Sequence, residues 1–163
     1  MHEPKTTRAR VEKTLQGQSF DFKCTACGNC CKGPGDVYFT EDDLKAIKDY
    51  LKLSAFAFAR LKRKLIQEKI PGYYVHRSGD ACLLLVDNKC SVYPVRPMQC
   101  STFPFWPSNF QSQANFRQLK KECPGTMSGK GKPLEAETVT RRVRKTEKEF
   151  LEPQQNTDKP IML

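Results

Sequence analysis

The sequence contains few of the groups that common enzyme sites use. Its 163 residues include only two histidines, His2 and His76, so a histidine-based catalytic triad has little to draw on. There is no nucleophile elbow, and Gly33-Pro34-Gly35 is too short for a phosphate or dinucleotide loop. We therefore find no catalytic constellation in this chain, and we favour a binding module over an enzyme.

Long hydrophobic runs are also missing. No apolar stretch approaches the roughly 20 residues that a membrane-spanning helix needs, so we expect no transmembrane segment. The start, Met-His-Glu-Pro-Lys, has neither an apolar signal region nor a small-residue cleavage site. We expect an intracellular protein of a reducing compartment, either the cytoplasm or the mitochondrial matrix. There, clustered cysteines are more often metal ligands or catalytic groups than disulfides.

The chain is strongly basic. Its net charge of +10 predicts attraction to an anionic partner. We expect protein partners in a larger complex, docked through a basic surface. The basic stretches 60–64 and 141–145 also suggest nucleic acid, but no recognisable nucleic-acid-binding signature accompanies them.

The composition favours a small α+β domain that is stabilised by metal. Hydrophobic residues make up 38% of the chain, which is lean for a core, and eleven prolines and nine glycines interrupt it. We expect a cysteine-rich loop, two or three helices and a small antiparallel sheet. The predicted organisation is a flexible basic arm at 1–19, a cysteine-cluster metal-binding domain at 20–129, and a linker, polar helix and tail at 130–163.

Local patterns predict the elements of this domain. A helix begins after Thr40, which is followed by three acidic residues, and its apolar residues lie on one face through Leu51. Further helices are predicted at 54–68, 113–122 and 134–151. Short strands are predicted at 37–39, 73–76, 82–86 and 90–93, with turns at 77–80 and 87–89.

Cysteine is the one abundant reactive residue. The eight cysteines are Cys24, Cys27, Cys30, Cys31, Cys82, Cys90, Cys100 and Cys123. The first four form C-x2-C-x2-C-C, and two-residue gaps let successive thiolates converge on one centre, as in zinc ribbons and ferredoxins. We predict that all eight are ligands of zinc or of an iron–sulfur cluster. The alternatives are that some cysteines merely pack in the core, or that they form disulfides.

The division of the cysteines among centres is a hypothesis. Cys123 precedes a proline, like the distant ligand of bacterial ferredoxins. One arrangement therefore groups it with Cys24, Cys27 and Cys30. The second group would then be Cys31, Cys82, Cys90 and Cys100.

Other side chains near the cysteines are candidates for supporting roles. Arg96 could donate hydrogen bonds to metal-bound thiolates, or it could be an ordinary surface arginine. His76 could join a zinc site, although a lone histidine is more often half-buried polar surface. Phe103, Phe105 and Trp106 could shield a cluster or grip a partner, and simple packing is an equal alternative for the two phenylalanines.

Four segments of the chain together resemble the cysteine-cluster (CxxCxxCC, YkgJ-type) family. They read KCTACGNCCKGPGDVYFTEDDL, DACLLL, KCSVYPVRPMQCSTFPFWPSNF and KKECPGTMSG, and they span about residues 22–129 in the family's order. The resemblance implies a zinc- or iron-chelating domain in which all eight cysteines occupy cluster positions. It also marks 96–97, 103–107 and 123–125 as characteristic elements.

The resemblance suggests three functions. Small proteins of this type are similar to accessory subunits of some protist respiratory complexes, so we favour a structural or accessory subunit of a larger assembly, such as a mitochondrial respiratory complex. An iron–sulfur redox or cluster-handling protein is the first alternative. The second is a metal-dependent enzyme component, because the cysteine cluster is similar to that of flagellin lysine methylases.

Overall fold

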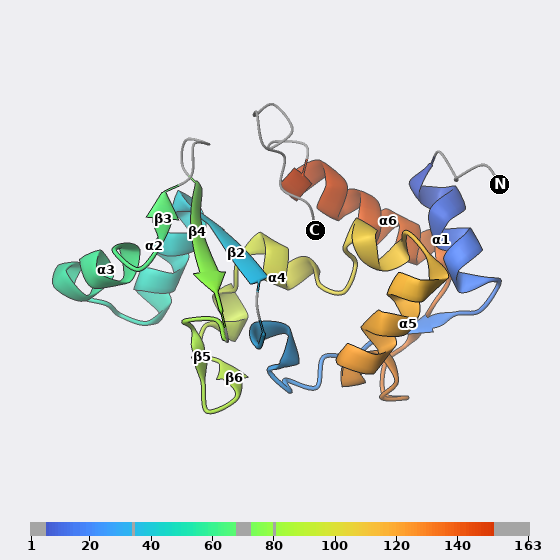
Figure 1. Cartoon of the computed structure of the whole chain (residues 1–163), viewed down its shortest axis with the longest axis horizontal. Helices are drawn as coiled ribbons and strands as arrows, with labels where there is room; N and C mark the ends of the chain where they lie inside the picture. Colours follow the sequence, from blue (N-terminus) through green and yellow to red (C-terminus); the bar gives the residue numbers. More distant parts are fainter. Residues whose placement is uncertain (1–5, 34, 68–72, 80, 152–163) are drawn as a thin grey trace. The chain divides into compact units, whose positions relative to one another are not determined.

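The computed structural model describes residues 6–33, 35–67, 73–79 and 81–151 (Figure 1). The chain divides into two compact units. Unit 1 comprises Met1–Cys27 and Thr102–Leu163, and unit 2 comprises Gly28–Ser101. The boundary falls inside the C-x2-C-x2-C-C loop, so Cys24 and Cys27 belong to unit 1 and Cys30 and Cys31 to unit 2.

Helices are the main regular elements of unit 1. They are α1 (Thr7–Leu15), α5 (Gln113–Glu122) and α6 (Ala136–Thr146), followed by the single π-helical segment η5 (Glu147–Leu151). The 3₁₀ turns η3 (Pro107–Phe110) and η4 (Pro124–Thr126) flank α5. Two short strands, β1 (Phe20–Asp21) and β7 (Pro133–Leu134), pair antiparallel. Figure 1 shows α1 in blue beside α6 in red.

An aromatic cluster forms the core of unit 1. The ring of Phe20 meets those of Phe105, Phe110 and Phe116 edge-on, with centroid distances of 6.0, 5.8 and 5.4 Å. Edge-to-face pairs of this kind add to the stabilisation from burial alone. Phe105 is 6% exposed. Its ring therefore packs in the core, which is one of the roles that the sequence suggests for this residue. The peptide bond between Phe103 and Pro104 is cis.

A helix occupies the segment for which the sequence predicts a flexible arm. In α1, Val11 is fully buried and Leu15 is 3% exposed, in the cluster that contains Val139 and Val143 of α6. Arg10 also forms a 2.8 Å ion pair with Glu147. A helix this short is marginal by itself in water, so its stability comes from tertiary packing. The sequence of α1 is mostly polar, and Val11 and Leu15 alone are too few to predict that this helix packs against the core.

Unit 2 combines a small antiparallel sheet with two helices. The sheet has the order β2 (Gly35–Thr40), β4 (Tyr73–Ser78) and β3 (Ile66–Gln67). The helices are α2 (Glu41–Tyr50) and α3 (Ala55–Lys62). The hairpin of β5 (Leu85–Val86) and β6 (Lys89–Cys90) follows, and then η2 (Tyr93–Val95) and α4 (Met98–Thr102). The core contains Phe39, Leu44, Ile47, Leu84 and Val92.

Several predicted elements are confirmed. The hydroxyl of Thr40 accepts a hydrogen bond from the amide of Asp43 at 3.0 Å, and the Asp43 carboxylate accepts one from the amide of Thr40 at 2.9 Å. This is the capping box of α2. Helix α5 has the predicted bounds. The β5–β6 turn carries Asp87 and Asn88 at φ 48° and 60°, as a tight two-residue hairpin requires.

Other elements differ from the prediction. Helix α3 ends at Lys62 rather than near 68, because Ile66 and Gln67 pair with Val75 and Tyr74 of β4. The α+β class is confirmed, and of the six α-helices in the described ranges the sequence does not predict α1 and α4. None of the helices in those ranges is both long and apolar enough to cross a membrane.

Gly28 places the cysteine loop directly against the β5–β6 hairpin. Its φ is 75°, and a Cβ added there would lie 2.3 Å from the backbone oxygen of Asn88. Gly33 has a similar φ of 83°, but nothing lies within 4 Å of an added Cβ. Both glycines therefore have a left-handed backbone that disfavours other residues. Only Gly28 also lies so close to a neighbouring backbone that a side chain would not fit.

We predict that Gly28→Ala destabilises the chain more than Gly33→Ala. A left-handed backbone costs a non-glycine residue about 1 kcal/mol, which is the loss expected for Gly33→Ala. For Gly28→Ala we expect about 3 kcal/mol, because the hairpin must also move. Urea denaturation of the metal-loaded variants measures both losses. Equal losses would show that the close approach does not matter.

Candidate metal centre

Five of the eight cysteines lie in unit 2, on short segments around the β5–β6 hairpin. Cys30 and Cys31 belong to the 3₁₀ turn η1 (Asn29–Cys31), Cys82 to the loop before β5, Cys90 to β6 and Cys100 to α4. The amide of Cys82 donates to the carbonyl of Cys31 at 2.8 Å, and Lys32 pairs with Ala81 beside them. Backbone pairing thus joins the first cysteine loop to a segment 50 residues away.

The hairpin positions Cys90 and the segment of Cys82 beside this backbone pairing. Cys90 pairs with Leu85 across the hairpin, and the amide of Leu85 donates to the carbonyl of Cys82 at 2.9 Å. Cys82 and Cys90 are both half-buried, and both pack against the core that contains Leu84 and Val92. The same hydrophobic cluster that folds unit 2 therefore also positions these two thiols.

His76 supports the segment that carries Cys82. The amide of Leu83 donates to Nε2 of His76 at 3.2 Å, and the carbonyl of Ala81 lies 3.5 Å from the same nitrogen. A nitrogen that accepts from the amide of Leu83 has no proton to donate to Ala81, so the ring holds the backbone on the C-terminal side of Cys82. This bracing role is not visible in the sequence, where His76 is a lone histidine on a strand.

Gln99 fixes the position of Cys100, its neighbour in α4. Its side chain is 5% exposed. Oε1 accepts from the amide of Tyr38 at 2.8 Å, and Nε2 donates to the carbonyl of Asp36 at 2.9 Å. Both partners lie on β2. Sequence analysis misses Gln99 altogether, since nothing in the chain marks it apart from the neighbouring cysteine.

The five thiols share one electrostatic environment. Hydrogen bonding with the thiol of Cys31 lowers the pKa of Cys30 to about 7 and that of Cys90 to about 6. The pKa of Cys31 is raised for the same reason. Burial raises the pKa of Cys82, and it raises that of Cys100 to about 12, and in both cases neighbouring thiolates add to the effect. Negative charge is therefore crowded here.

Arg96 supplies positive charge to this cluster. In addition to the larger effects above, its charge lowers the pKa of Cys30, Cys90 and Cys100. Its guanidinium carbon lies 4.0 Å from the centroid of the Tyr93 ring, and Nη1 donates to the carbonyl of Tyr93 at 3.4 Å. Its Nε is buried and has no hydrogen-bond partner among the described residues. A buried donor without an acceptor costs about 1–3 kcal/mol, and a thiolate would remove that cost.

The other three cysteines lie in unit 1. The amide of Lys23 donates to the carbonyl of Gly125 at 2.9 Å, so the backbones next to Cys24 and Cys123 run side by side. The sulfur of Cys24 accepts from the amide of Ala26 at 3.4 Å, and Cys24 is exposed. Cys123 is 9% exposed within the aromatic core, which is also what the packing alternative predicts.

The donor set fits a metal that prefers sulfur. None of the eight cysteines forms a disulfide. Within the described ranges, no three Cys, His, Asp or Glu side chains already converge as a ready-made ligand set, and Cys31 is instead hydrogen-bonded with Cys30 and Cys90. The cluster nevertheless has the features expected around a thiolate-bound metal: several sulfurs close together, a neighbouring arginine, and a buried N–H that lacks an acceptor.

A comparison of the sequence with known protein families finds a match for the cysteine-containing part of the chain. Residues 23–124, more than half of the chain, match the CxxCxxCC family, whose description is "Putative zinc- or iron-chelating domain". The chain belongs to the CxxCxxCC family. No solved structure matches it significantly. The CxxCxxCC domain is thus a metal-binding one, as the sequence predicts, and all eight cysteines lie inside the matched residues.

The five unit 2 thiols are the residues of the CxxCxxCC domain that the structure brings together. Four of them, Cys31, Cys82, Cys90 and Cys100, form one of the two groups in the predicted arrangement. Cys30 interacts with this group as well, whereas in unit 1 the backbone beside Cys24 is hydrogen-bonded to Gly125, two residues after Cys123. The assignment of ligands to separate centres stays a prediction.

We predict that Arg96→Lys weakens metal binding while Arg63→Lys, a change at an exposed arginine of the same unit, does not. Lysine keeps the positive charge but lacks the planar guanidinium and its Nε–H. Loss of such a partner to a metal ligand typically lowers metal affinity about 10–100-fold. Competition with a chelator measures the affinity of each variant. Unchanged affinity in Arg96→Lys would exclude a role for Nε.

Proposed function

We propose that the thiol cluster holds a structural metal centre, and that the chain serves as an accessory subunit of a larger assembly in a reducing compartment. The observation that carries the proposal is the gathering of Cys30, Cys31, Cys82, Cys90 and Cys100 on loops and very short elements of one unit. Such a centre is either zinc, closed by thiolates, or an iron–sulfur cluster.

A metal would add most stability to the segments of unit 2 that have the least regular secondary structure. Strands β5 and β6 have two residues each, and η1 is a single 3₁₀ turn. These elements have few backbone hydrogen bonds of their own to hold them together. A metal that binds only the folded arrangement adds its binding free energy to folding. Ligation would therefore link segments as far apart in the chain as Cys30 and Cys100.

The exposed face of α6 supports docking to an acidic partner. Arg141, Arg144, Lys145 and Lys148 are all exposed. Their spacing places them on one side of the helix, while Val139, Val143 and Thr146 on the other side are buried. Lys145 pairs with Glu149 at 3.7 Å, which is a weak surface contact. A row of cations with so little internal compensation suits a negatively charged protein surface.

The metal itself is tested by anaerobic purification of the full chain. We expect stoichiometric metal, and the content of zinc, iron and acid-labile sulfide is measured together with the visible spectrum. Zinc without sulfide or colour supports a structural centre. Iron with matching sulfide and a chromophore that bleaches on reduction favours the redox alternative. A folded chain without bound metal would contradict the proposal.

The docking surface is tested by charge reversal. We expect the wild-type chain in its native extract to sediment with a large assembly, and Arg141→Glu/Arg144→Glu to sediment as the free 18.7 kDa chain. Arg60→Glu/Arg63→Glu, the same charge change at exposed Arg60 of α3 and at exposed Arg63, which follows the helix, is the matched control and should leave the assembly intact. Metal content confirms that each variant is folded.

Two results would count against docking through α6. A wild-type chain that sediments at its own mass would exclude the assembly altogether. An assembly that dissociates on nuclease treatment would show that the partner is a nucleic acid.

A further inference from the structure

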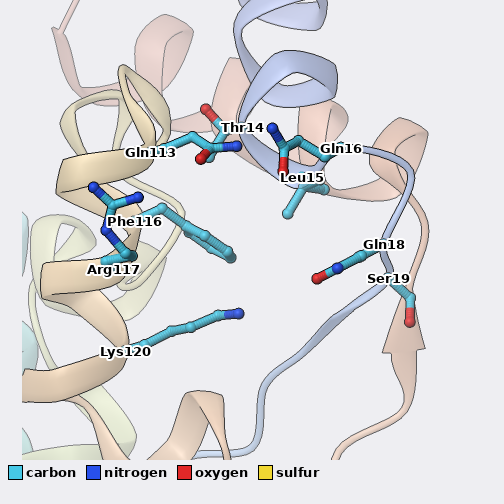
Figure 2. A pocket seen from close by; sticks show the side chains of 9 residues that line it. All are labelled: Thr14, Leu15, Gln16, Gln18, Ser19, Gln113, Phe116, Arg117 and Lys120. Atoms are coloured by element: carbon cyan, nitrogen blue, oxygen red, sulfur yellow. The ribbon is translucent and has the colours of Figure 1, made fainter.

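A small pocket opens in unit 1, outside the cysteine cluster. It has a volume of about 150 Å³ and lies between α5 and the segment that follows α1 (Figure 2). Its apolar part is made by Leu15 and Phe116, which are 3% and 8% exposed. The rest of its lining is polar, so the pocket has a firm apolar side and a rim of hydrogen-bonding groups.

Two cations from α5 line the pocket. Arg117 and Lys120 are three residues apart and therefore lie on the same face of the helix. The Nζ of Lys120 is 4.7 Å from the centroid of the Phe116 ring, a cation–π contact. Arg117 is exposed and makes no ion pair with any residue in the described part of the chain. No acidic residue lines the pocket, so the positive charge has no local counterion.

Neutral hydrogen-bonding groups complete the lining. The side-chain amides of Gln16, Gln18 and Gln113 and the hydroxyl of Ser19 line the pocket. None of these side chains makes a hydrogen bond with the residues that the structure describes. Gln16 and Gly17 have φ values of 52° and 77°, and this left-handed turn after α1 directs the chain across the pocket. In Figure 2, Gln18 and Lys120 extend toward each other from opposite sides.

We propose that this pocket binds a phosphoryl group, as inorganic phosphate or as a small phosphomonoester. Two cations match a phosphate, which carries about −1.5 to −2 charges at neutral pH, better than they match a single carboxylate. The guanidinium of Arg117 can bind two phosphate oxygens at once, and the amides and hydroxyl can donate to the others. The volume is well below the roughly 300–1,000 Å³ of pockets for larger ligands, which restricts the site to one such group.

The site is independent of the metal centre and of the α6 surface. It uses α5 and the residues after α1, and it contains no cysteine. Its residues 14–19 lie outside the part of the chain that matches the CxxCxxCC family, which ends at 124 and begins at 23. The pocket therefore gives this chain a binding capacity in addition to metal binding.

Calorimetric titration of the metal-loaded full chain at low salt tests the proposal. The probes are inorganic phosphate, O-phosphoserine and acetate. We expect saturable one-to-one binding of a phosphate-bearing probe, weakened at least about tenfold in Arg117→Ala and in Lys120→Gln, because each removes a charged hydrogen-bond donor. Lys120→Gln keeps a side chain to cover Phe116. Lys121→Ala removes an exposed lysine of the same helix that does not line the pocket, and it should bind like the wild type.

The probes separate the two sources of the phosphoryl group. Tighter binding of inorganic phosphate identifies the free ion as the ligand, and tighter binding of phosphoserine identifies a phosphomonoester. Three results overturn the proposal: no saturable binding, acetate binding as tight as that of phosphate, or equal weakening in Lys121→Ala and Lys120→Gln. Metal content, measured on each sample, verifies that every variant is folded.

Discussion

The crowding of five thiols around the β5–β6 hairpin is the constraint on which the rest of unit 2 depends. Cys31 is hydrogen-bonded with Cys30 and Cys90, and the other two thiols lie within the field of these sulfurs. Thiolates held this close repel one another unless positive charge is near. Arg96 supplies part of that charge, with a buried Nε still lacking an acceptor. In the proposed centre a bound metal ion would supply the rest of the positive charge.

The loops reach this arrangement because the sheet and the core hold them from behind. Gln99 connects the α4 segment to β2, and His76 of β4 accepts the amide of Leu83 next to Cys82. Gly28 allows the first cysteine loop to pass the turn at Asn88 without a side chain in between. Each of these contacts acts on backbone beside a cysteine. The segments that carry these cysteines are therefore positioned by ordinary hydrogen bonds, so a metal bound there would have fewer conformations to restrict.

Unit 1 has a different balance of forces. Its core consists of aromatic rings and the valines of α1 and α6, with Val11, Val139 and Val143 almost completely buried. The charged residues are left on the outer faces of α5 and α6, where few acidic residues compensate them. The apolar core gives this unit its stability, and the uncompensated cations determine what it attracts. The proposed anion binding at the pocket and the proposed docking along α6 both rest on this one charge distribution.

The sequence by itself determined the chemistry. The spacing of the cysteines, the capping box at Thr40 and Asp43, and the turn at Asp87 and Asn88 are local signals, because ligand gaps, caps and turns depend on residues a few positions apart. Only the tertiary structure decided which distant residues meet. The bracing by His76 and Gln99, the burial of Val11 and the pocket beside Lys120 each join segments about 7 to 130 residues apart. Local sequence patterns do not encode such contacts, since they arise from the tertiary packing of segments that are separated in the chain.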